Sequence, residues 1–284
     1  MQLSIESRTG PLDGIVAATV TPFSEDGSLD LESWRRLLEF LAAEGVSGIY
    51  ACGTTGESPF LAADERIALA KTAVEVLSSA AVKVAVHVGA PTTSETARLA
   101  RHCSQTGVDA LAVVSPSYYR FPETLIERHF AAVIEAADHI PMYLYNLPGY
   151  TGNTFGPETA MRLSEGFNNV GGVKDSSKDF DVTDSFIASG IDTLSGTDGQ
   201  VAPSLLCGAV GAVSAVACCE PRIVVQATSA LQRRDIDQIR ASHRAIVKTR
   251  VELKRGPQIV PYKQRLQEKR ILLSARVRAP LGAP

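Results

Sequence analysis

Lys174 is the residue of this sequence with the clearest capacity for covalent chemistry. It lies in the run Val-Gly-Gly-Val-Lys-Asp-Ser from residue 170 to residue 176, at the end of an apolar segment typical of a buried strand. Loss of hydration lowers the pKa of a lysine and favours the neutral, nucleophilic amine, which forms Schiff bases with ketones. The alternative is an ordinary rim lysine whose ammonium pairs with Asp175.

Tyrosines near other strand ends could move protons to and from such an amine. In the run Tyr-Leu-Tyr-Asn-Leu-Pro from residue 143 to residue 148, strand alternation places Tyr143 and Tyr145 on the same side. A phenol close to the amine could relay protons, or both residues could be core tyrosines hydrogen-bonded to backbone. Tyr118 and Tyr119, after another expected strand, allow the same two interpretations.

A segment rich in glycine and threonine, Gly-Thr-Thr-Gly-Glu-Ser from residue 53 to residue 58, follows an earlier expected strand. Its two glycines allow a close turn, and the N–H groups and hydroxyls around Gly53, Thr54 and Thr55 could hold a carboxylate or a phosphate. A tight turn without any ligand explains the same residues equally well.

Asp198 lies in a second glycine-rich region, between Gly196 and Gly199, near the last two expected strands. Barrel enzymes often bind phosphate at this place. However, no Arg or Lys is close to Asp198 in the sequence, and a carboxylate accepts hydrogen bonds from hydroxyls and repels anions. The sequence therefore favours a neutral polyol over a phosphate as the ligand of this region.

Motifs of several other enzyme classes are absent from the sequence. We find no metal-ligand cluster, no Walker loop, no Gly-x-Ser-x-Gly elbow and no pair of carboxylates placed for glycoside hydrolysis. His87 is expected to be a hydrogen-bonded core residue rather than a base. The other histidines are expected at the surface: His102, His129, His139 and His243. Acid–base chemistry would then depend on Tyr, Lys or a carboxylate.

Composition excludes several classes of partner. The 28 basic and 31 acidic residues give a formal net charge of -3, so we expect no nucleic-acid-binding surface. No apolar run reaches the roughly 18 residues of a membrane span, and the N-terminus lacks the apolar core of a secretion signal. Five cysteines without a Cys-x-x-Cys pair indicate buried thiols in a reducing cytoplasm, with Cys218 and Cys219 packed beside the last strand.

The elements that must position these residues are eight short apolar segments that alternate with segments of helical pattern. This alternation predicts an α/β fold with a closed (β/α)8 barrel. An open doubly wound sheet is the alternative, but no Gly-x-Gly-x-x-Gly fingerprint follows the first strand. The predicted strands are 15–21, 48–52, 83–88, 110–114, 142–146, 171–174, 193–196 and 209–214, and the predicted helices are 30–44, 62–79, 94–106, 122–138, 157–165, 179–189, 199–207 and 221–231. We expect the barrel to span residues 1–232, followed by a helical extension of the same domain over residues 233–284, with helices at 234–255 and 258–273.

Four segments together resemble one known family. In chain order they are Gly-Thr-Thr-Gly-Glu from residue 53, Pro-x-Tyr-Tyr from residue 116, Tyr-Asn-x-Pro-x-x-Thr-Gly from residue 145 and Gly-Val-Lys-Asp-Ser-Ser from residue 172. This set resembles the dihydrodipicolinate synthase / N-acetylneuraminate lyase family over essentially the whole chain. The resemblance implies a (β/α)8 barrel with added C-terminal helices, a homotetramer, and class I aldolase chemistry without a metal or an organic cofactor.

By this resemblance, Lys174 is the lysine that forms a Schiff base with the C2 carbonyl of pyruvate or another 2-oxo acid. Tyr145 is similar to the tyrosine that relays protons during Schiff-base formation and the aldol step. The positive nitrogen of the iminium would act as electron sink for C3–C4 cleavage, leaving an enamine that is protonated to release pyruvate.

The resemblance also assigns residues around these two. Thr54 and Thr55, with Gly53, match the cradle of the pyruvate carboxylate, and Thr55 is expected to hydrogen-bond toward Tyr145. Tyr118 resembles the tyrosine that completes the proton relay from a neighbouring subunit, although Tyr119 is an alternative match.

The substrate separates members of the family, and here the sequence departs from two of them. Dihydrodipicolinate synthases carry an Arg where this chain has Tyr150, and a tyrosine cannot replace a bidentate guanidinium. Sialic acid lyases have a Ser where Thr54 stands, an acidic residue where Gly199 stands and a Ser near Ala215. The loss of two hydroxyl contacts favours a shorter sugar chain.

The site pattern resembles most the aldolases of 2-keto-3-deoxy sugar acids such as 2-keto-3-deoxygluconate. Asp198, with backbone at Gly196 and Ala215, would lie near the distal hydroxyls. Three enzymatic alternatives remain: a dihydrodipicolinate synthase, a family dehydratase that breaks a C–O bond, and an N-acetylneuraminate lyase. A protein that only binds a 2-oxo acid, as a sensor or scaffold, is the alternative outside enzymes.

Overall fold

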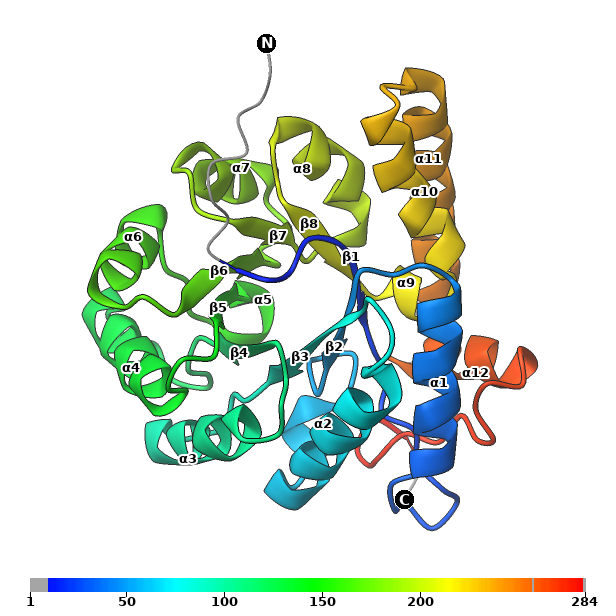
Figure 1. Ribbon diagram of the computed structural model, residues 1–284, viewed down its shortest axis with the longest axis horizontal. Coiled ribbons are helices and arrows are strands. Elements are labelled where there is room, and N and C mark those ends of the chain that lie inside the picture. Colours follow the sequence, from blue (N-terminus) through cyan, green and yellow to red (C-terminus); the bar gives the residue numbers. More distant parts are fainter. Residues whose placement is uncertain (1–9, 257, 283–284) are drawn as a thin grey trace.

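Eight parallel strands form a closed barrel in chain order, with β8 pairing back onto β1 (Figure 1). The structure is a computed structural model and describes residues 10–256 and 258–282. The strands are β1 Gly14–Ala18, β2 Gly48–Ala51, β3 Lys83–His87, β4 Ala110–Val114, β5 Met142–Asn146, β6 Val170–Asp175, β7 Thr193–Ser195 and β8 Gly211–Ser214. They lie where the apolar segments predicted them, and the α/β barrel is confirmed. Most of the N-terminal segment that we expected to lack a secretion signal lies outside the described residues.

Helices follow the strands and cover the outside of the barrel (Figure 1). They are α1 Leu31–Ala43, α2 Ala63–Leu77, α3 Thr93–Ser104, α4 Glu123–Ala136, α6 Pro157–Gly166, α7 Phe180–Ala188, α8 Val201–Cys207 and α10 Pro221–Gln232. Local sequence sets several starts: the Asp30 side chain accepts a hydrogen bond from the Ser33 N–H ahead of α1, and Asp179 caps α7 in the same way. Short helical segments at the loops were not predicted: η1 Ser58–Phe60, α5 Pro148–Thr151, η2 Asp198–Gln200 and α9 Val216–Cys219.

Alternate residues of the strands face two different apolar cores. In β1, Val16 belongs to the core inside the barrel, whereas Ile15 belongs to the larger core beneath the helices. In β5, Tyr143 and Tyr145 face the inside and Leu144 faces the helices, as the alternation predicted. Tyr145 faces the cavity at the C-terminal end of the barrel, whereas the Tyr143 hydroxyl accepts a hydrogen bond from the Leu12 N–H, ahead of β1, at 2.9 Å.

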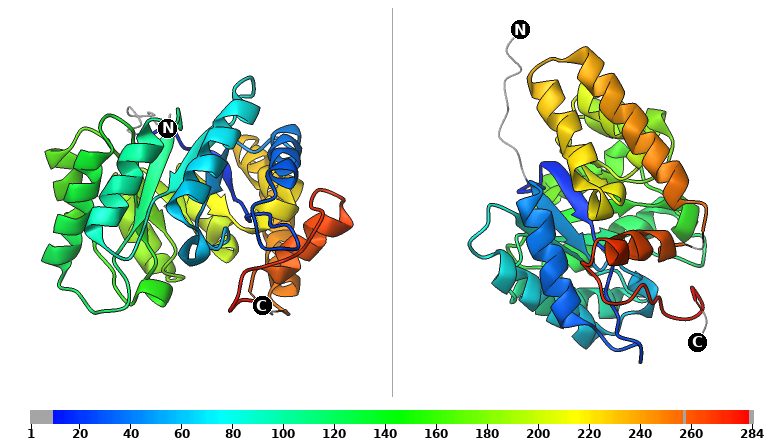
Figure 2. Two further views of the ribbon diagram at one scale, coloured as in Figure 1. Left: turned by 90° about the horizontal axis from the view of Figure 1, so that it is seen from below. Right: turned by 90° about the vertical axis from the view of Figure 1, so that its right-hand side faces the viewer.

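The chain after α10 forms α11 Ile236–Leu253 and α12 Val260–Glu268, outside the ring of eight helices (Figure 2). The second helix is shorter than the predicted range 258–273. It ends at Glu268, and Arg270 then adopts a left-handed backbone with φ of 60°, which turns the chain back. The following residues return to the barrel and bury Leu272 and Val277. In the part of the chain that the structure describes, no helix is both long and apolar enough to cross a membrane.

Two predictions about burial are wrong. His129, expected at the surface, is buried on α4, where its Nδ1 lies 2.9 Å from Thr93 Oγ1, and burial lowers the pKa of His129 to about 4. Cys207, expected to be buried, is exposed at the end of α8, where the chain leaves the core. The other four cysteines are buried, and Cys218 and Cys219 lie in α9 directly after β8, as expected.

Candidate active site

A cavity of about 190 Å³ opens at the C-terminal end of the barrel, where barrel enzymes carry their chemistry. Loops that follow β2, β5, β6, β7 and β8 form its walls, and α11 and α12 add residues on one side. Nine of the ten predicted site residues line it: Gly53, Thr54, Thr55, Tyr145, Tyr150, Lys174, Gly196, Asp198 and Ala215.

Lys174 lies at the floor of this cavity, on β6, with 4% of its surface exposed. Its Nζ lies 3.7 Å from the ring centroid of Tyr50 and 3.9 Å from that of Tyr145. Burial lowers the pKa of Lys174 well below its usual value, and the Asp198 carboxylate opposes this shift without cancelling it. The arrangement favours the neutral amine, the form that adds to carbonyl groups.

The alternative in which Lys174 pairs with Asp175 is wrong. Strand alternation turns Asp175 away from the cavity and toward α7. There its carboxylate accepts hydrogen bonds from Asn146 Nδ2 and Thr183 Oγ1, each at 2.7 Å. Lys174 therefore faces the inside of the barrel, whereas Asp175 faces the helices outside it.

Tyr145 faces the cavity from β5, and its hydroxyl oxygen lies 3.5 Å from Thr54 Oγ1. Burial raises the pKa of Tyr145, and the hydroxyls of Thr54 and Ser176 oppose this shift. The phenol is protonated near neutral pH, so it can both donate and accept a hydrogen bond. The expected contact of Thr55 with Tyr145 is wrong, because successive side chains of the turn point in different directions and Thr54 is the one that reaches β5.

The backbone of the turn that carries both threonines depends on particular residues. A Cβ at Gly53 would lie 2.6 Å from Tyr50 Cε1, so glycine is needed for the turn to pass over this ring. Glu57 adopts a left-handed backbone with φ of 62° and is buried. Its carboxylate lies 2.6 Å from Lys263 Nζ of α12 and accepts a hydrogen bond from the Arg278 N–H at 2.8 Å. The C-terminal extension thus holds the threonine turn.

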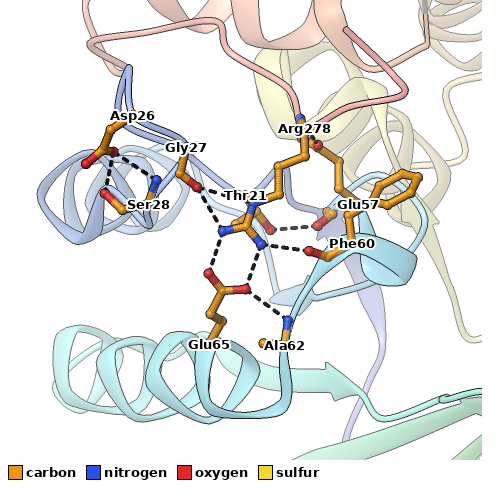
Figure 3. A network of polar contacts seen from close by, with 10 residues as sticks. Thr21, Asp26, Gly27, Ser28, Glu57, Phe60, Ala62, Glu65 and Arg278 are labelled. Carbon is orange, nitrogen blue, oxygen red and sulfur yellow. Dashed lines mark hydrogen bonds and ion pairs between the residues drawn. The ribbon is translucent and has the colours of Figure 1, made fainter. Parts of the chain in front are cut away.

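Arg278 extends this support to neighbouring loops (Figure 3). Its guanidinium donates to the carbonyl oxygens of Gly27 at 2.9 Å and Phe60 at 2.7 Å, and to Glu65 Oε2 at 2.6 Å. These contacts join the loop after β1, the segment after β2 and the start of α2. Glu57 and Arg278 lie 221 residues apart in the sequence, so no local pattern announces the contact.

Asp198 is buried in η2, after β7. Its Oδ1 accepts hydrogen bonds from the Ser214 hydroxyl and, at 3.4 Å, from the Val216 N–H. Burial raises the pKa of Asp198, whereas these two hydrogen bonds and the cations Arg250 and Lys254 oppose the shift. One oxygen of Asp198 therefore links η2 to β8 and α9.

Three cations line the same cavity, namely Lys178 from the loop after β6, Arg250 from α11 and Lys254, which directly follows α11. Between described residues, no ion pair involves any of them. Burial lowers the pKa of Lys254, and repulsion from Arg250 and Lys178 lowers it further. The prediction of a neutral polyol assumed that no cation lies near Asp198, and this premise is wrong: α11 brings two cations to Asp198 from a distant part of the sequence.

Two further predicted residues, Tyr150 and Gly196, shape the cavity. Tyr150 is 53% exposed at the mouth. Gly196 directly follows β7, and an added Cβ there would lie 2.9 Å from the Asp175 carbonyl oxygen of β6.

Tyr118 and Tyr119 lie outside the cavity of their own chain. Their exposed fractions are 89% and 67%, and their rings stack edge to face with centroids 5.0 Å apart. Tyr118 has a left-handed backbone with φ of 79°. Its role in the site of a neighbouring subunit stays a prediction.

Tyr50 is the main site residue that sequence reasoning missed. It is fully buried on β2 beneath Lys174, and its hydroxyl has no hydrogen-bond partner among the described residues. The alternation of β2 could have placed it on the inner wall. By contrast, no local signal marks Arg250, Lys254 or Tyr262, which reach the cavity from helices outside the barrel.

His87 is a core histidine of β3, as expected. Its Nδ1 lies 3.2 Å from the Cys52 carbonyl oxygen and 3.1 Å from Ser58 Oγ. Burial keeps the pKa of His87 well below its usual value, which favours the neutral imidazole. Across the described residues, no group of three or more His, Cys, Asp or Glu side chains is placed to hold a metal ion.

Comparison with known proteins places the chain in one family. The model of the dihydrodipicolinate synthetase family matches residues 11–283. An uncharacterized DapA-like lyase of Halobacterium salinarum is 35% identical over 261 residues, which cover 90% of this chain and 84% of that protein. The 4-hydroxy-tetrahydrodipicolinate synthase of Methanothrix thermoacetophila is 37% identical over 81% of this chain and 78% of its own length.

Solved structures agree with the sequence comparison. YagE of Escherichia coli K12, a prophage protein of the dihydrodipicolinic acid synthase family solved in complex with pyruvate, superposes with a TM-score of 0.90. It is 28% identical, and the match covers 96% of this chain and 93% of YagE. Dihydrodipicolinate synthase from Aquifex aeolicus superposes with a TM-score of 0.89 at 28% identity, covering 95% and 92% of the two chains. The chain therefore belongs to the dihydrodipicolinate synthetase family of pyruvate-dependent lyases.

Proposed function

We propose that this protein is a class I aldolase that forms a Schiff base through Lys174 and reversibly cleaves a 2-keto-3-deoxy sugar acid, such as 2-keto-3-deoxygluconate, to pyruvate and an aldehyde. The observation that carries the proposal is the buried Lys174 amine, which lies between the Tyr50 and Tyr145 rings beside the threonine turn. A protein that only bound a 2-oxo acid would not need a desolvated amine, which argues against a sensor or scaffold.

In this reaction, Lys174 Nζ adds to the C2 carbonyl, and loss of water gives an iminium that accepts electrons from the C3–C4 bond. The turn at Gly53, Thr54 and Thr55 holds the C1 carboxylate. Tyr145 gives its phenolic proton to the hydroxyl that leaves the carbinolamine as water, and as the phenolate, held by its contact with Thr54, it takes the proton of the C4 hydroxyl while the C3–C4 bond breaks and the aldehyde leaves. The enamine is then protonated at C3, and hydrolysis of the iminium releases pyruvate and the free lysine.

A second candidate is the condensation of pyruvate with aspartate semialdehyde. The named relatives of Methanothrix thermoacetophila and Pelobacter propionicus, which are 4-hydroxy-tetrahydrodipicolinate synthases, favour it. Tyr150, exposed at the cavity mouth, argues against it because a phenol cannot clamp a carboxylate as a guanidinium does. A family dehydratase or an N-acetylneuraminate lyase would use the same Lys174 and Tyr145.

We further propose a homotetramer in which Tyr118 completes the proton relay of a neighbouring subunit, with Tyr119 as the alternative. The large exposure of both rings supports this, because exposed adjacent tyrosines are typical of interfaces. The five unpaired cysteines support a cytoplasmic location. Sedimentation velocity tests the oligomer, and a monomer with full activity would contradict the shared relay.

Reductive trapping tests the Schiff base directly. The protein is incubated with pyruvate and sodium borohydride, and intact mass followed by peptide mapping is expected to show one reduced pyruvyl adduct on Lys174. Lys248→Met, at an exposed position of α11, is the matched control and is expected to label fully. An unlabelled Lys174 peptide would end the proposal, whereas dominant activity with pyruvate and aspartate semialdehyde would favour the second candidate.

A further inference from the structure

The mouth of the cavity carries positive charge that the proposed aldolase chemistry does not use. Lys178, Arg250 and Lys254 line it, whereas Asp198 is the one carboxylate among the described lining residues. Together, these three cations and the Asp198 carboxylate carry a net charge of two positive units. A 2-oxo acid with an uncharged tail would place its single carboxylate at the threonine turn and leave this excess unbalanced.

The three cations line the same cavity and form no ion pair with a described residue; Lys178 and Lys254 are exposed, and Asp198 attracts Arg250 and Lys254. Arg250 is half-buried, and its Nη1 would lie 3.3 Å from a Cβ added at Gly199, so its guanidinium lies against η2 rather than in solvent. Lys254 experiences repulsion from both Arg250 and Lys178. Like charges kept together in a partly enclosed site cost free energy, and a bound anion removes that cost.

We propose that Lys178, Arg250 and Lys254 form an anion subsite for the distal end of the substrate, so that among the substrates of the proposed aldolase the protein prefers 2-oxo acids whose far end carries a carboxylate or a phosphate. The inference rests on the proposed Schiff base at Lys174, which fixes the near end of the substrate. Arg250 offers a planar pair of donors suited to either group, and the two lysines add charge. Asp198 would accept hydrogen bonds from hydroxyls between the two ends.

Space for such a substrate lies in two cavities that share part of their lining near the end of α11. A second cavity of about 370 Å³ adjoins the first and shares Thr54, Tyr150, Lys178, Lys254 and Tyr262 with it. A ligand attached to Lys174 can thus extend past Tyr150 toward the cations.

Two 2-oxo acids of equal chain length test the subsite without requiring turnover. The probes are 2-oxoadipate, which ends in a carboxylate, and 2-oxohexanoate, which ends in a methyl group. Each competes with pyruvate for borohydride trapping at Lys174 in the full-length protein. We expect 2-oxoadipate to compete about tenfold more strongly or better at low salt, and the preference to shrink as sodium chloride is raised.

A second pair of probes separates carboxylate from phosphate recognition. 2-Keto-3-deoxygluconate and its 6-phosphate differ only in the distal group, and their kcat/KM values are compared in the retro-aldol direction. A preference for the 6-phosphate of about tenfold or more would identify phosphate as the distal group. A preference confined to 2-oxoadipate would identify a carboxylate.

Variants assign the effect to the cations. Arg250→Gln and Lys254→Gln are each expected to reduce the preference for the anionic probe several-fold, while competition by 2-oxohexanoate stays within about twofold. Gly199→Asp, which adds a carboxylate beside Arg250, is expected to act in the same direction without shortening any cation. Lys248→Gln, at an exposed position of α11 outside the cavity, is the matched control and is expected to change nothing.

The outcomes distinguish this inference from the proposed function. Equal competition by both 2-oxo acids, with pyruvate trapping intact and no preference between the sugar acids, would overturn the anion subsite and leave the aldolase proposal standing. Failure of pyruvate trapping would overturn the aldolase proposal. Calorimetric titration with 2-oxoadipate and 2-oxohexanoate would then decide the subsite by itself, because equal affinities would overturn it.

Discussion

The floor and the mouth of the cavity are built by different parts of the chain and carry different kinds of residue. At the floor, the strand register pairs Tyr145 with Lys174, and both side chains are buried. At the mouth, Arg250 lies on α11 and Lys254 directly follows this helix, outside the barrel; Arg250 is half-buried and Lys254 is exposed. The register of the barrel strands thus positions the residues of the proposed reaction, whereas selection of the distal group of the substrate would depend on a helix outside the barrel.

The largest expected effect is at the floor. Lys174→Met is expected to lower retro-aldol kcat by about 10⁴-fold or more, because the amine is the nucleophile. The melting temperature is expected to stay or rise, since an apolar side chain replaces a buried amine without an acidic partner. Lys254→Met at the mouth is the matched variant and should retain pyruvate trapping. Substantial turnover by Lys174→Met would break the division between floor and mouth.

The next largest effect is expected on stability, at the ion pair of Glu57 with Lys263 that supports the threonine turn. Glu57→Gln leaves Lys263 buried without its acidic partner, so the free energy of unfolding is expected to fall by about 3 kcal/mol. Glu65→Gln removes the charge of Glu65 from its ion pair with Arg278, whose side chains are 19% and 20% exposed. The free energy of unfolding is expected to fall by about 1 kcal/mol. Urea unfolding at one protein concentration measures both. Equal losses would show that Lys263 does not brace the turn through a buried charge.

A smaller effect is expected for the relay. Tyr145→Phe is expected to lower kcat by about 10²-fold, because it removes the hydroxyl that exchanges protons with Thr54 but leaves the ring above Lys174. Tyr150→Phe, the same change at the mouth, is expected to alter KM more than kcat. Steady-state kinetics of the two variants compares them. Full turnover by Tyr145→Phe would remove its role as relay.

The smallest effect is expected in the pH dependence of trapping between neutral and alkaline solution. Only the neutral amine of Lys174 reacts, and its fraction rises as pH increases through the pKa of the folded protein. Because burial lowers that pKa, the rate of pyruvate trapping should rise with pH and level off well below pH 10.5. A rate that still climbs at pH 10 would show an ordinary, solvated lysine. Stopped-flow quenching with borohydride measures the profile.

Burial at single positions was the least predictable property of the fold. His129 and Cys207 each occupy the expected element but the opposite environment, because the exposed side of a helix depends on what packs against it. The helix expected to reach residue 273 ends at Glu268, since the turn at Arg270 returns the chain to the barrel. Periodicity locates elements, whereas contacts between elements decide their ends and their buried sides.

From the sequence by itself, the barrel and the floor of the site could be determined. Eight apolar segments imply strands covered on both faces, and closure of a parallel barrel brings all their C-terminal ends to one rim, where Lys174, Tyr145 and the threonine turn must meet. Only the tertiary structure decided which threonine reaches Tyr145, and that Lys263 and Arg278 hold Glu57. It also brought Arg250 and Lys254 to Asp198. The physical reason is that side chains alternate along a strand every two residues, a pattern visible in the local sequence. The docking of the C-terminal helices depends on contacts between distant segments and leaves no local pattern.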